Sequence, residues 1–340
     1  MRKLNILVAG STGYIGVQLV KLLTQHPNIK IKYLCGNSSV GKNISSFDKF
    51  FKNKNLPKIS KFNKKNLKDI DIIFTALPNG EAQLLSKNLL KKNILIDLAA
   101  DFRIENPKVY KKWYKTNHKA VKKISDSIYG LPELSGKNLK KYKIIACPGC
   151  YPTSILLPLL PLIKNKLIYE KNIIVDSKSG YSGAGRGVHK KYAKKNLYQS
   201  LSAYGVGLHR HNSEIDQEIS KVCKKKFQVS FTPHLSPMFR GILSTIYVDI
   251  SKKTNPSSVY KLLKKIYKGK NFIKFAKFNV PVSTNDVINT NNCLISVCKS
   301  KYNNKLIILS AIDNLIKGGA GQAVQNMNII SNFPEYRGLK

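Results

Sequence analysis

Two cysteines three positions apart are the first residues in this chain that could do chemistry. Cys147 and Cys150 lie in the stretch I-I-A-C-P-G-C-Y-P-T, residues 144–153, and are separated by a proline and a glycine. This spacing is shared by dithiol redox sites, by half of a zinc site, and by a single nucleophile with an uninvolved neighbour. The residues around the two cysteines are therefore needed to decide between these three interpretations.

The position of Cys150 favours a nucleophile. The apolar residues 144–147 predict a strand, and residues 154–163 predict a helix despite their two prolines. Cys150 therefore falls at or near a helix N-terminus, where the helix dipole and free N–H groups stabilise a thiolate. The same N–H groups can hold an oxyanion on the carbon that the sulfur attacks.

The zinc and dithiol interpretations have less support. Zinc would need further ligands at metal spacing, but Cys223, Cys293 and Cys298 are scattered and no histidine pair matches them. We therefore expect no metal. Cys147 is the last residue of an apolar strand and is expected to point into the core, which disfavours a dithiol.

A nucleophilic thiol usually needs a proton shuttle, and one stretch offers it. G-L-H-R-H-N-S-E-I-D, residues 207–216, places His209 and His211 on either side of Arg210, just before a predicted helix. Clustered histidines at the end of an element are hard to explain by packing, so both are candidate acid/base residues. The other histidines are expected at the surface (His26, His118) or in structural roles (His189, His234).

Three glycines at a spacing of three predict a dinucleotide-binding turn. Gly10, Gly13 and Gly16 in G-S-T-G-Y-I-G follow an apolar strand and precede an amphipathic helix. Such glycines permit a tight turn, close approach of a phosphate, and packing of the helix on the strand. The helix N-terminus then faces the pyrophosphate.

The second predicted strand indicates which dinucleotide binds. An NAD-binding site usually ends this strand with an acid that takes the ribose 2′-hydroxyl. Here the strand ends C-G-N-S-S-V-G-K, without a carboxylate, whereas Asn37, Ser38, Ser39 and Lys42 could donate hydrogen bonds to a 2′-phosphate. We therefore expect NADP as the cofactor.

The elements that must position these residues predict an α/β protein. In the first half of the chain, strands alternate with helices, which predicts a Rossmann-type, doubly wound parallel sheet. After residue 150 the strands are spaced further apart and predict a mixed or antiparallel sheet in an α/β domain, and residues 322–330 predict a closing helix.

The net charge of +41 is a weak argument for nucleic-acid binding. Nearly all of the positive charge is lysine, dispersed among apolar positions as on solvated faces. The charge should instead favour small anionic substrates. No apolar segment approaches the roughly 20 residues of a membrane span, and the six unevenly spaced cysteines do not form a disulfide framework. We expect a cytoplasmic protein with no nucleic-acid or membrane partner.

The motifs together resemble N-acetyl-γ-glutamyl-phosphate reductase, a family related to aspartate-semialdehyde dehydrogenase. The resemblance runs in order over essentially the whole chain. It is carried by G-S-T-G-Y-I-G (10–16), L-A-A-D-F-R (98–103), Y-G-L-P-E-L (129–134), P-G-C-Y-P-T (148–153), S-K-S-G-Y-S-G-A-G-R (177–186), H-R-H-N-S-E-I (209–215), F-T-P-H-L-S-P-M-F-R-G (231–241) and D-N-L-I-K-G-G-A-G-Q-A-V-Q-N (313–326).

The resemblance implies a reaction and an architecture. The reaction is the NADPH-dependent reduction of N-acetyl-L-glutamyl 5-phosphate to the 5-semialdehyde in arginine biosynthesis, through a thioester on Cys150. The resemblance also implies a cofactor domain, residues 1–148, which is completed by a C-terminal helix, residues 315–332. A catalytic and oligomerisation domain, 149–314, and a homodimer or homotetramer are also implied.

The resemblance also assigns roles to individual residues. One histidine of H-R-H moves protons, and we expect His209 rather than His211. Arg103 or Arg210 would bind the carboxylate or phosphate of the substrate. The expected cofactor-binding residues are Gly10, Ser11, Thr12, Gly13, Tyr14, Ile15, Gly16, Ser38, Ser39, Ser182, Gly183, Asn314 and Gly318. Cys147 stands where the family pattern has an asparagine before P-G-C. The motifs do not distinguish the acetylglutamyl substrate from one that is a methylene longer.

Overall fold

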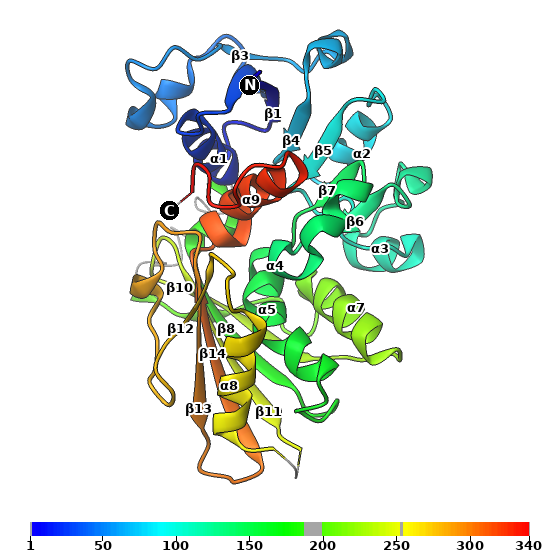
Figure 1. The fold of residues 1–340 in the computed structure, drawn as a ribbon. Coiled ribbons are helices and arrows are strands. Elements are labelled where there is room, and N and C mark those ends of the chain that lie inside the picture. Colours follow the sequence, from blue (N-terminus) through cyan, green and yellow to red (C-terminus); the bar gives the residue numbers. More distant parts are fainter. Residues whose placement is uncertain (1, 187–198, 252–253, 340) are drawn as a thin grey trace. The chain divides into compact units, whose positions relative to one another are not determined.

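The computed structural model describes residues 2–186, 199–251 and 254–339, and the chain forms two compact units (Figure 1). The first unit combines residues 1–148 with residues 319–340, and the second comprises residues 149–318. His189 lies outside the described residues.

The first unit is built on a seven-stranded sheet in the order β3-β2-β1-β4-β5-β7-β6. All of its neighbouring strands are parallel. The order reverses beside β1, which produces the switch point where such sheets bind ligands. This arrangement confirms the predicted doubly wound sheet. The strands are β1 (Leu4–Ala9), β2 (Ile29–Cys35), β3 (Ile59–Ser60), β4 (Ile72–Thr75), β5 (Ile94–Asp97), β6 (Ser127–Tyr129) and β7 (Ile144–Ala146).

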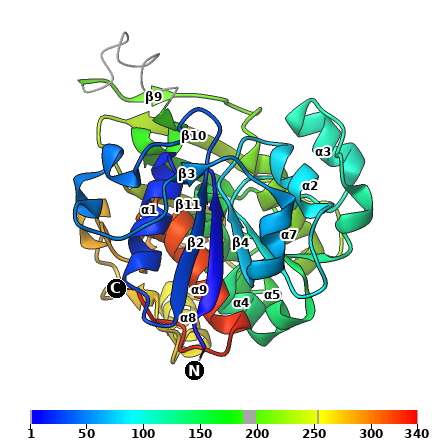
Figure 2. The ribbon, with the colours of Figure 1, turned by 90° about the horizontal axis from the view of Figure 1, so that it is seen from above.

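Along the chain, α1 follows β1, α2 follows β4, α3 follows β5 and α4 follows β6. Figure 2 shows α1 to the left and α2 to the right of β1. The last helix of the chain returns to this unit, where it packs on the first helix and against β5. Residues 37–69, between β2 and β4, contain three short 3₁₀ turns and β3. The helices are α1 (Tyr14–Thr24), α2 (Glu81–Ser86), α3 (Pro107–Tyr114), α4 (Pro132–Ser135) and α9 (Gly321–Ile330).

The second unit contains a mixed seven-stranded sheet in the order β12-β13-β14-β11-β8-β10-β9. β8 and β10 are parallel, as are β12 and β13, and the other pairs are antiparallel. The predicted mixed sheet is therefore confirmed. The strands are β8 (Ile174–Gly180), β9 (Ser202–Ala203), β10 (Ser230–Ser236), β11 (Ile242–Asp249), β12 (Ile273–Phe275), β13 (Cys293–Lys299) and β14 (Lys305–Ile312).

Three helices lie on one side of this sheet: α5 (Cys150–Lys164), α7 (His211–Cys223) and α8 (Pro256–Ile266) (Figure 1). α5 packs on β11 and β14, α8 packs on β13, and α7 packs on α5. Alternate residues of β8 and β11 point to the other side, where Ile174 and Tyr247 are exposed.

α5 contains two prolines that ordinarily break a helix. Pro161 has no N–H to donate to the carbonyl of Leu157, and that carbonyl instead accepts a hydrogen bond of 2.6 Å from the Tyr267 hydroxyl. Because α5 is almost wholly buried, apolar packing on β11 and β14 also offsets the lost helical hydrogen bonds.

Candidate active site

Cys150 is the first residue of α5, and Gly149 is the N-cap residue. No side chain caps this end of the helix, so its first N–H groups face the same space as the thiol. Cys150 is partly exposed, unlike Cys147. The structure therefore places the candidate nucleophile at a helix N-terminus, as expected from the sequence.

His211 lies against the backbone that precedes Cys150. A Cβ atom added to Gly149 would lie only 2.4 Å from Nε2 of His211, so a side chain there would displace the imidazole. His211 is itself the first residue of α7, and α7 packs along α5. The two helix N-termini thus bring the thiol and one imidazole to the same place.

Glu214 fixes both sides of this arrangement, although no role was predicted for it. Its fully buried carboxylate accepts a hydrogen bond of 2.9 Å from the Gly149 N–H, and its other oxygen lies 3.7 Å from Nε2 of His211. Residues three apart share one face of a helix, so the spacing H-x-x-E was the available signal. This geometry suits a residue that orients a catalytic histidine.

His209 occupies a different environment, enclosed by aromatic rings. Its ring lies edge-on to Tyr151, Tyr204 and Phe231 at centroid distances of 5.6, 5.3 and 5.7 Å. Burial, with the nearby Arg210 charge, lowers the pKa of His209 to about 4. Its Nδ1 accepts a hydrogen bond of 3.2 Å from the His211 N–H. His209 is therefore neutral at neutral pH and supports the first turn of α7.

Gly318, in the π-helical turn Ile316–Ala320, also lies close to Cys150. A Cβ atom added to Gly318 would lie 2.6 Å from the Cβ atom of Cys150. Asn314 donates a hydrogen bond of 3.0 Å to Ser182, accepts one of 2.7 Å from the Gly241 N–H, and lies beside Gly183. Four expected cofactor-binding residues belong to the second unit. Ser182, Gly183 and Asn314 lie close to one another, and Gly318 lies close to Cys150.

The two candidate substrate arginines differ in exposure. Arg103 is buried, and its guanidinium donates to the carbonyls of Cys147 and Leu98 at 2.7 and 2.9 Å. Arg210 is exposed at the N-cap position of α7. Arg103 therefore also holds the backbone that leads towards the nucleophile, while Arg210 faces solvent next to both histidines.

In the first unit the glycine turn has the geometry that a dinucleotide requires. Gly10 has a φ of +82°, and a Cβ atom there would lie 2.3 Å from the Ala76 carbonyl oxygen. A Cβ atom at Gly16 would lie 2.1 Å from the Gly10 carbonyl oxygen. Gly13 caps α1 without a side-chain hydrogen bond, which leaves the N-terminus of the helix to a phosphate.

Some candidate cofactor residues in this turn have structural surroundings instead. The Ser11 side chain is fully buried, and its hydroxyl donates to the Cys35 carbonyl at 3.3 Å. Ser38 is exposed beyond β2, whereas Ser39 is buried. Thr12, Tyr14 and Ile15 are partly exposed at the start of α1.

A cavity of about 460 Å³ lies at the carboxyl ends of β1, β2 and β4, next to the glycine turn. Most of the residues around it could not be predicted from sequence, because they come from segments without a motif. Its walls combine apolar and polar side chains, a composition that suits an aromatic ring with polar edges. The lining residues are Ala9, Cys35, Gly36, Asn37, Phe62, Leu77, Glu81, Leu84, Leu85, Asn88 and Lys119.

Cys147 does not have the surroundings of a reactive thiol. It is buried, its sulfur lies 3.6 Å from the Asn326 amide nitrogen, and burial raises its pKa to about 12. The expectation that it points into the core is confirmed. Two other expectations were wrong: His26 and His118 are buried rather than exposed, and burial lowers the pKa of each.

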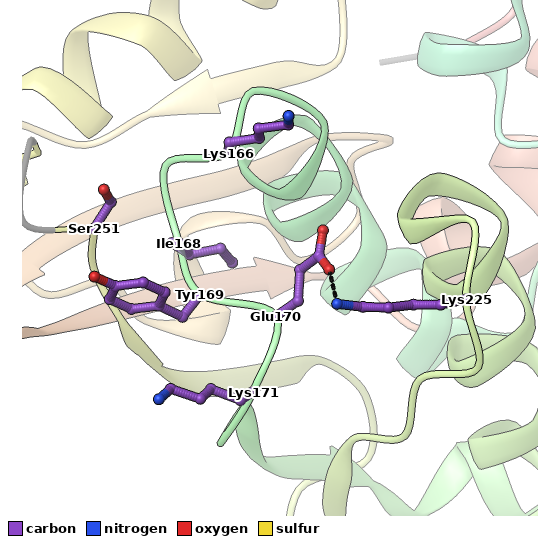
Figure 3. Close-up of a pocket in the computed structure, with 7 residues that line it drawn as sticks. All are labelled: Lys166, Ile168, Tyr169, Glu170, Lys171, Lys225 and Ser251. Carbon is purple, nitrogen blue, oxygen red and sulfur yellow. Dashed lines mark ion pairs between the residues drawn. The ribbon is translucent and has the colours of Figure 1, made fainter.

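A further cavity, of about 450 Å³, lies beyond the C-terminal ends of α5 and α7 (Figure 3). Lys225 pairs with Glu170 there at 2.5 Å, and Lys166 and Lys171 also line it. Lys166 and Lys225 lie two residues beyond the ends of α5 and α7, where a positive side chain complements the helix dipole. Among the described residues, no His, Cys, Asp and Glu side chains gather as a metal site, and no helix could span a membrane.

Comparisons with known proteins agree with this fold. Residues 5–142 match the NAD binding domain of semialdehyde dehydrogenases, and residues 150–314 match their dimerisation domain. The fold resembles that of aspartate semialdehyde dehydrogenase II from Vibrio cholerae, with a TM-score of 0.72, 17% identity, and coverage of 97% of this chain and 99% of that one. In class the protein is therefore a semialdehyde dehydrogenase, an oxidoreductase.

The sequence relatives define the family more narrowly. N-acetyl-gamma-glutamyl-phosphate reductase of Desulforamulus reducens is 40% identical over 98% of this chain and 96% of the relative. The enzyme of the same name from Ehrlichia ruminantium is 42% identical over 99% of this chain and 97% of the relative. The chain belongs to the N-acetyl-γ-glutamyl-phosphate reductase family.

Proposed function

We propose that this protein catalyses the reversible, NADPH-dependent reductive dephosphorylation of N-acetyl-L-glutamyl 5-phosphate to N-acetyl-L-glutamate 5-semialdehyde, a step of arginine biosynthesis. The observation that carries the proposal is the position of Cys150 at the N-terminus of α5, where His211 lies against the neighbouring Gly149 and Glu214 lies 3.7 Å from the His211 Nε2 atom. Thiol, imidazole and carboxylate in this order form an activated nucleophile.

The first half-reaction forms a thioester. His211 takes the proton of the Cys150 thiol, and the thiolate attacks the acyl carbon of the phosphorylated substrate. The bond between that carbon and the phosphate oxygen breaks, and phosphate leaves with the electron pair. The open N–H groups of α5 stabilise the oxyanion that forms during the attack.

The second half-reaction releases the aldehyde. NADPH, when bound, supplies the hydride that reduces the thioester carbon. The resulting thiohemiacetal oxyanion collapses, the bond from sulfur to carbon breaks, and the Cys150 thiolate takes back the proton held by His211. The released phosphate takes its own proton from solvent, so atoms and charge balance.

We assign the proton transfer to His211 rather than to His209, which reverses the preference drawn from sequence. His211 lies against the backbone of Gly149 and beside the Glu214 carboxylate. His209 is enclosed by aromatic rings, and its pKa of about 4 leaves it without a proton to donate at neutral pH. A catalytic acid and base works best with a pKa near the operating pH.

We place the adenosine half of NADPH in the cavity of the first unit, with the pyrophosphate at the N-terminus of α1. The apolar walls at Phe62, Leu77 and Leu84 suit an adenine ring. The segment after β2 carries Asn37, Ser38, Ser39 and Lys42 but no carboxylate, which favours a 2′-phosphate. Equal KM values for NADPH and NADH would contradict this preference.

The decisive experiment is the reverse reaction, the phosphate-dependent oxidation of N-acetylglutamate 5-semialdehyde with NADP. The absorbance of the reduced cofactor measures its rate. Wild-type protein should be active, Cys150→Ala should lose activity, and Cys147→Ala should stay active. Residual wild-type rate in Cys150→Ala would remove Cys150 from its role. An inactive wild type would remove the proposed reaction.

We further propose a cytoplasmic homo-oligomer that uses the open face of the sheet in the second unit. This unit is the one that matches a dimerisation domain. Ile174 and Tyr247, which lie opposite each other on β8 and β11, are 49% and 40% exposed on that face. Exposed apolar side chains on a large sheet are characteristic of an interface. No nucleic acid or membrane partner is part of the proposal.

A further inference from the structure

We propose that Asp101 is the positioning residue of the cofactor cavity in the first unit. The inference rests on the proposed function in one respect, since it takes NADPH to be the ligand of that cavity. Asp101 does not line the cavity. It acts through the segments that do, and it belongs to the motif L-A-A-D-F-R, of which only the arginine had been given a role.

The Asp101 carboxylate caps a helix that does not cap itself. α2 begins after Gly80, which has a φ of +91° and no side chain to accept from the first N–H groups. Asp101 supplies the missing acceptor from another segment. Its oxygens accept hydrogen bonds from the Gly80 N–H at 2.7 Å and the Gln83 N–H at 3.2 Å. A negative charge at this end also complements the helix dipole.

This cap matters for the cavity because α2 forms one of its walls. Glu81, Leu84 and Leu85 of α2 line the cavity, and Asn88 follows just after the helix. α2 has only six residues, far fewer than an isolated helix needs to be stable. Its position therefore depends on groups outside it, and Asp101 is fully buried beneath its N-terminus.

A second path leads from Asp101 to Lys119, another residue of the cavity wall. The Gln83 side-chain amide donates to Asp101 at 3.3 Å, and its carbonyl accepts from the Lys119 N–H at 2.6 Å. The backbone carbonyl of Asp101 is itself bonded to His118 Nε2 at 2.8 Å. One residue thus sets the position of α2 and of the segment at Lys119 together.

The site is built for a carboxylate and not for its isosteric amide. The Tyr110 hydroxyl also donates to Asp101, at 3.2 Å, so the two oxygens accept four hydrogen bonds and donate none. In Asp101→Asn the new NH₂ group would face at least one of these donors. A buried donor left without an acceptor is costly, and α2 would shift to relieve it.

The test compares Asp101→Asn with Asp126→Asn, a matched change in a half-buried aspartate of the same unit. The Asp126 carboxylate forms an ion pair with Lys123 at 3.0 Å. NADPH binding is measured by the fluorescence of the reduced nucleotide, and steady-state kinetics are measured in parallel. Asp101→Asn should raise both Kd and KM for NADPH about tenfold, which corresponds to about 1.4 kcal/mol, with kcat within about twofold. Asp126→Asn should match wild type.

The outcomes separate this proposal from the proposed function. A wild type that neither binds nor uses NADPH removes the proposed function. A wild type that does, together with an Asp101→Asn variant of unchanged Kd and KM, removes the positioning role. If Asp101→Asn does not fold, the variant Gln83→Met tests the same positioning role. This variant removes the side-chain hydrogen bonds of Gln83, and with them the path to Lys119, but it leaves the Gly80 N–H bonded to Asp101. It should raise KM for NADPH without lowering kcat; an unchanged KM in that variant overturns the proposal.

Discussion

At the scale of single residues, the two histidines of the H-R-H stretch lie in environments that favour different roles. His211 lies beside Gly149 and Glu214, whereas His209 lies among Tyr151, Tyr204 and Phe231. An imidazole that moves protons needs an orienting carboxylate, and one that supports a helix turn needs packing. The structure supplies each of these to a different histidine.

The first prediction separates the two histidines kinetically. His211→Asn should lower kcat about 10²- to 10⁴-fold, the usual contribution of a general acid–base group, with a smaller effect on KM for NADPH. His209→Phe keeps the aromatic contacts and should lose much less. Steady-state rates and pH–rate profiles for both variants check this. A larger loss in His209→Phe than in His211→Asn would return the proton transfer to His209.

The second prediction concerns stability and pH. The pKa of His209 is about 4 in the folded chain, below the ordinary value of 6.5, because burial disfavours its charged form. Between these values the unfolded chain binds a proton that the folded chain does not, so stability falls as pH drops from about 6.5 to 4. His209→Phe should weaken this dependence. Urea unfolding at several pH values measures it, and parallel curves for the two proteins would contradict it.

Residue types and spacing predicted part of this site and missed the rest for a physical reason. Cys150 and the histidines were identifiable because a thiol at a strand-to-helix turn and clustered imidazoles have few structural explanations. Glu214 was visible in the same motif, but a glutamate in a predicted helix is ordinarily a solvated side chain. Its burial against Gly149 depends on α7 packing on α5, which no local pattern encodes.

At the scale of elements, two segments approach Cys150 and its N-cap residue, each at a contact where one partner is a glycine. The π-helical turn Ile316–Ala320 approaches Cys150 at Gly318, and His211 approaches at Gly149. Departures from regular α-helix of this kind often occur at functional sites. The sequence predicted strands and helices from their periodicity, but a π-helical turn has no periodic signature and was not predicted.

The third prediction tests this close approach. In Gly318→Ala the new methyl group would lie 2.6 Å from the Cβ atom of Cys150, so the turn or the start of α5 must move. Because a misplacement of about 1 Å can cost about 10²-fold in rate, kcat should fall by at least about tenfold. Circular dichroism and thermal unfolding should show a folded protein. Wild-type kcat in a folded variant would show that the turn gives way without disturbing Cys150.

The doubly wound sheet was predictable because its strands alternate with helices, whereas the cavity walls were not. Leu84 and Asn88 reach the cavity through α2, which is too short to stand out in a hydrophobic pattern. Its placement depends on the buried Asp101 carboxylate, a tertiary contact between segments about 20 residues apart. Local sequence therefore predicted the glycine turn after β1 but not the cavity wall that α2 forms beside it.

At the scale of the whole molecule, the charge and the open sheet face decide what the protein meets in solution. Lysine and arginine number 59 against 18 aspartates and glutamates, and several of these acids are buried. Such a field raises the local concentration of anionic substrates and is screened by salt. It does not favour association of two copies, so a dimer has to be held by apolar contacts.

The fourth prediction places those contacts on the open face formed by β8 and β11. Tyr247 is 40% exposed there, opposite Ile174 in the antiparallel register. Tyr247→Lys would put a charge in the centre of the proposed interface, where burial without a partner is unfavourable, and like charges on the second copy would add repulsion. The variant should therefore shift from oligomer to monomer in light scattering after size exclusion.

The matched control is Tyr302→Lys, which makes the same change at a more exposed tyrosine between β13 and β14. It adds the same charge to an already basic chain and so separates a local effect on the face from a general effect of charge. Tyr302→Lys should keep the oligomeric state of the wild type. If both variants remain oligomeric, the copies associate through another surface, and if both dissociate, the charge of the whole molecule controls association.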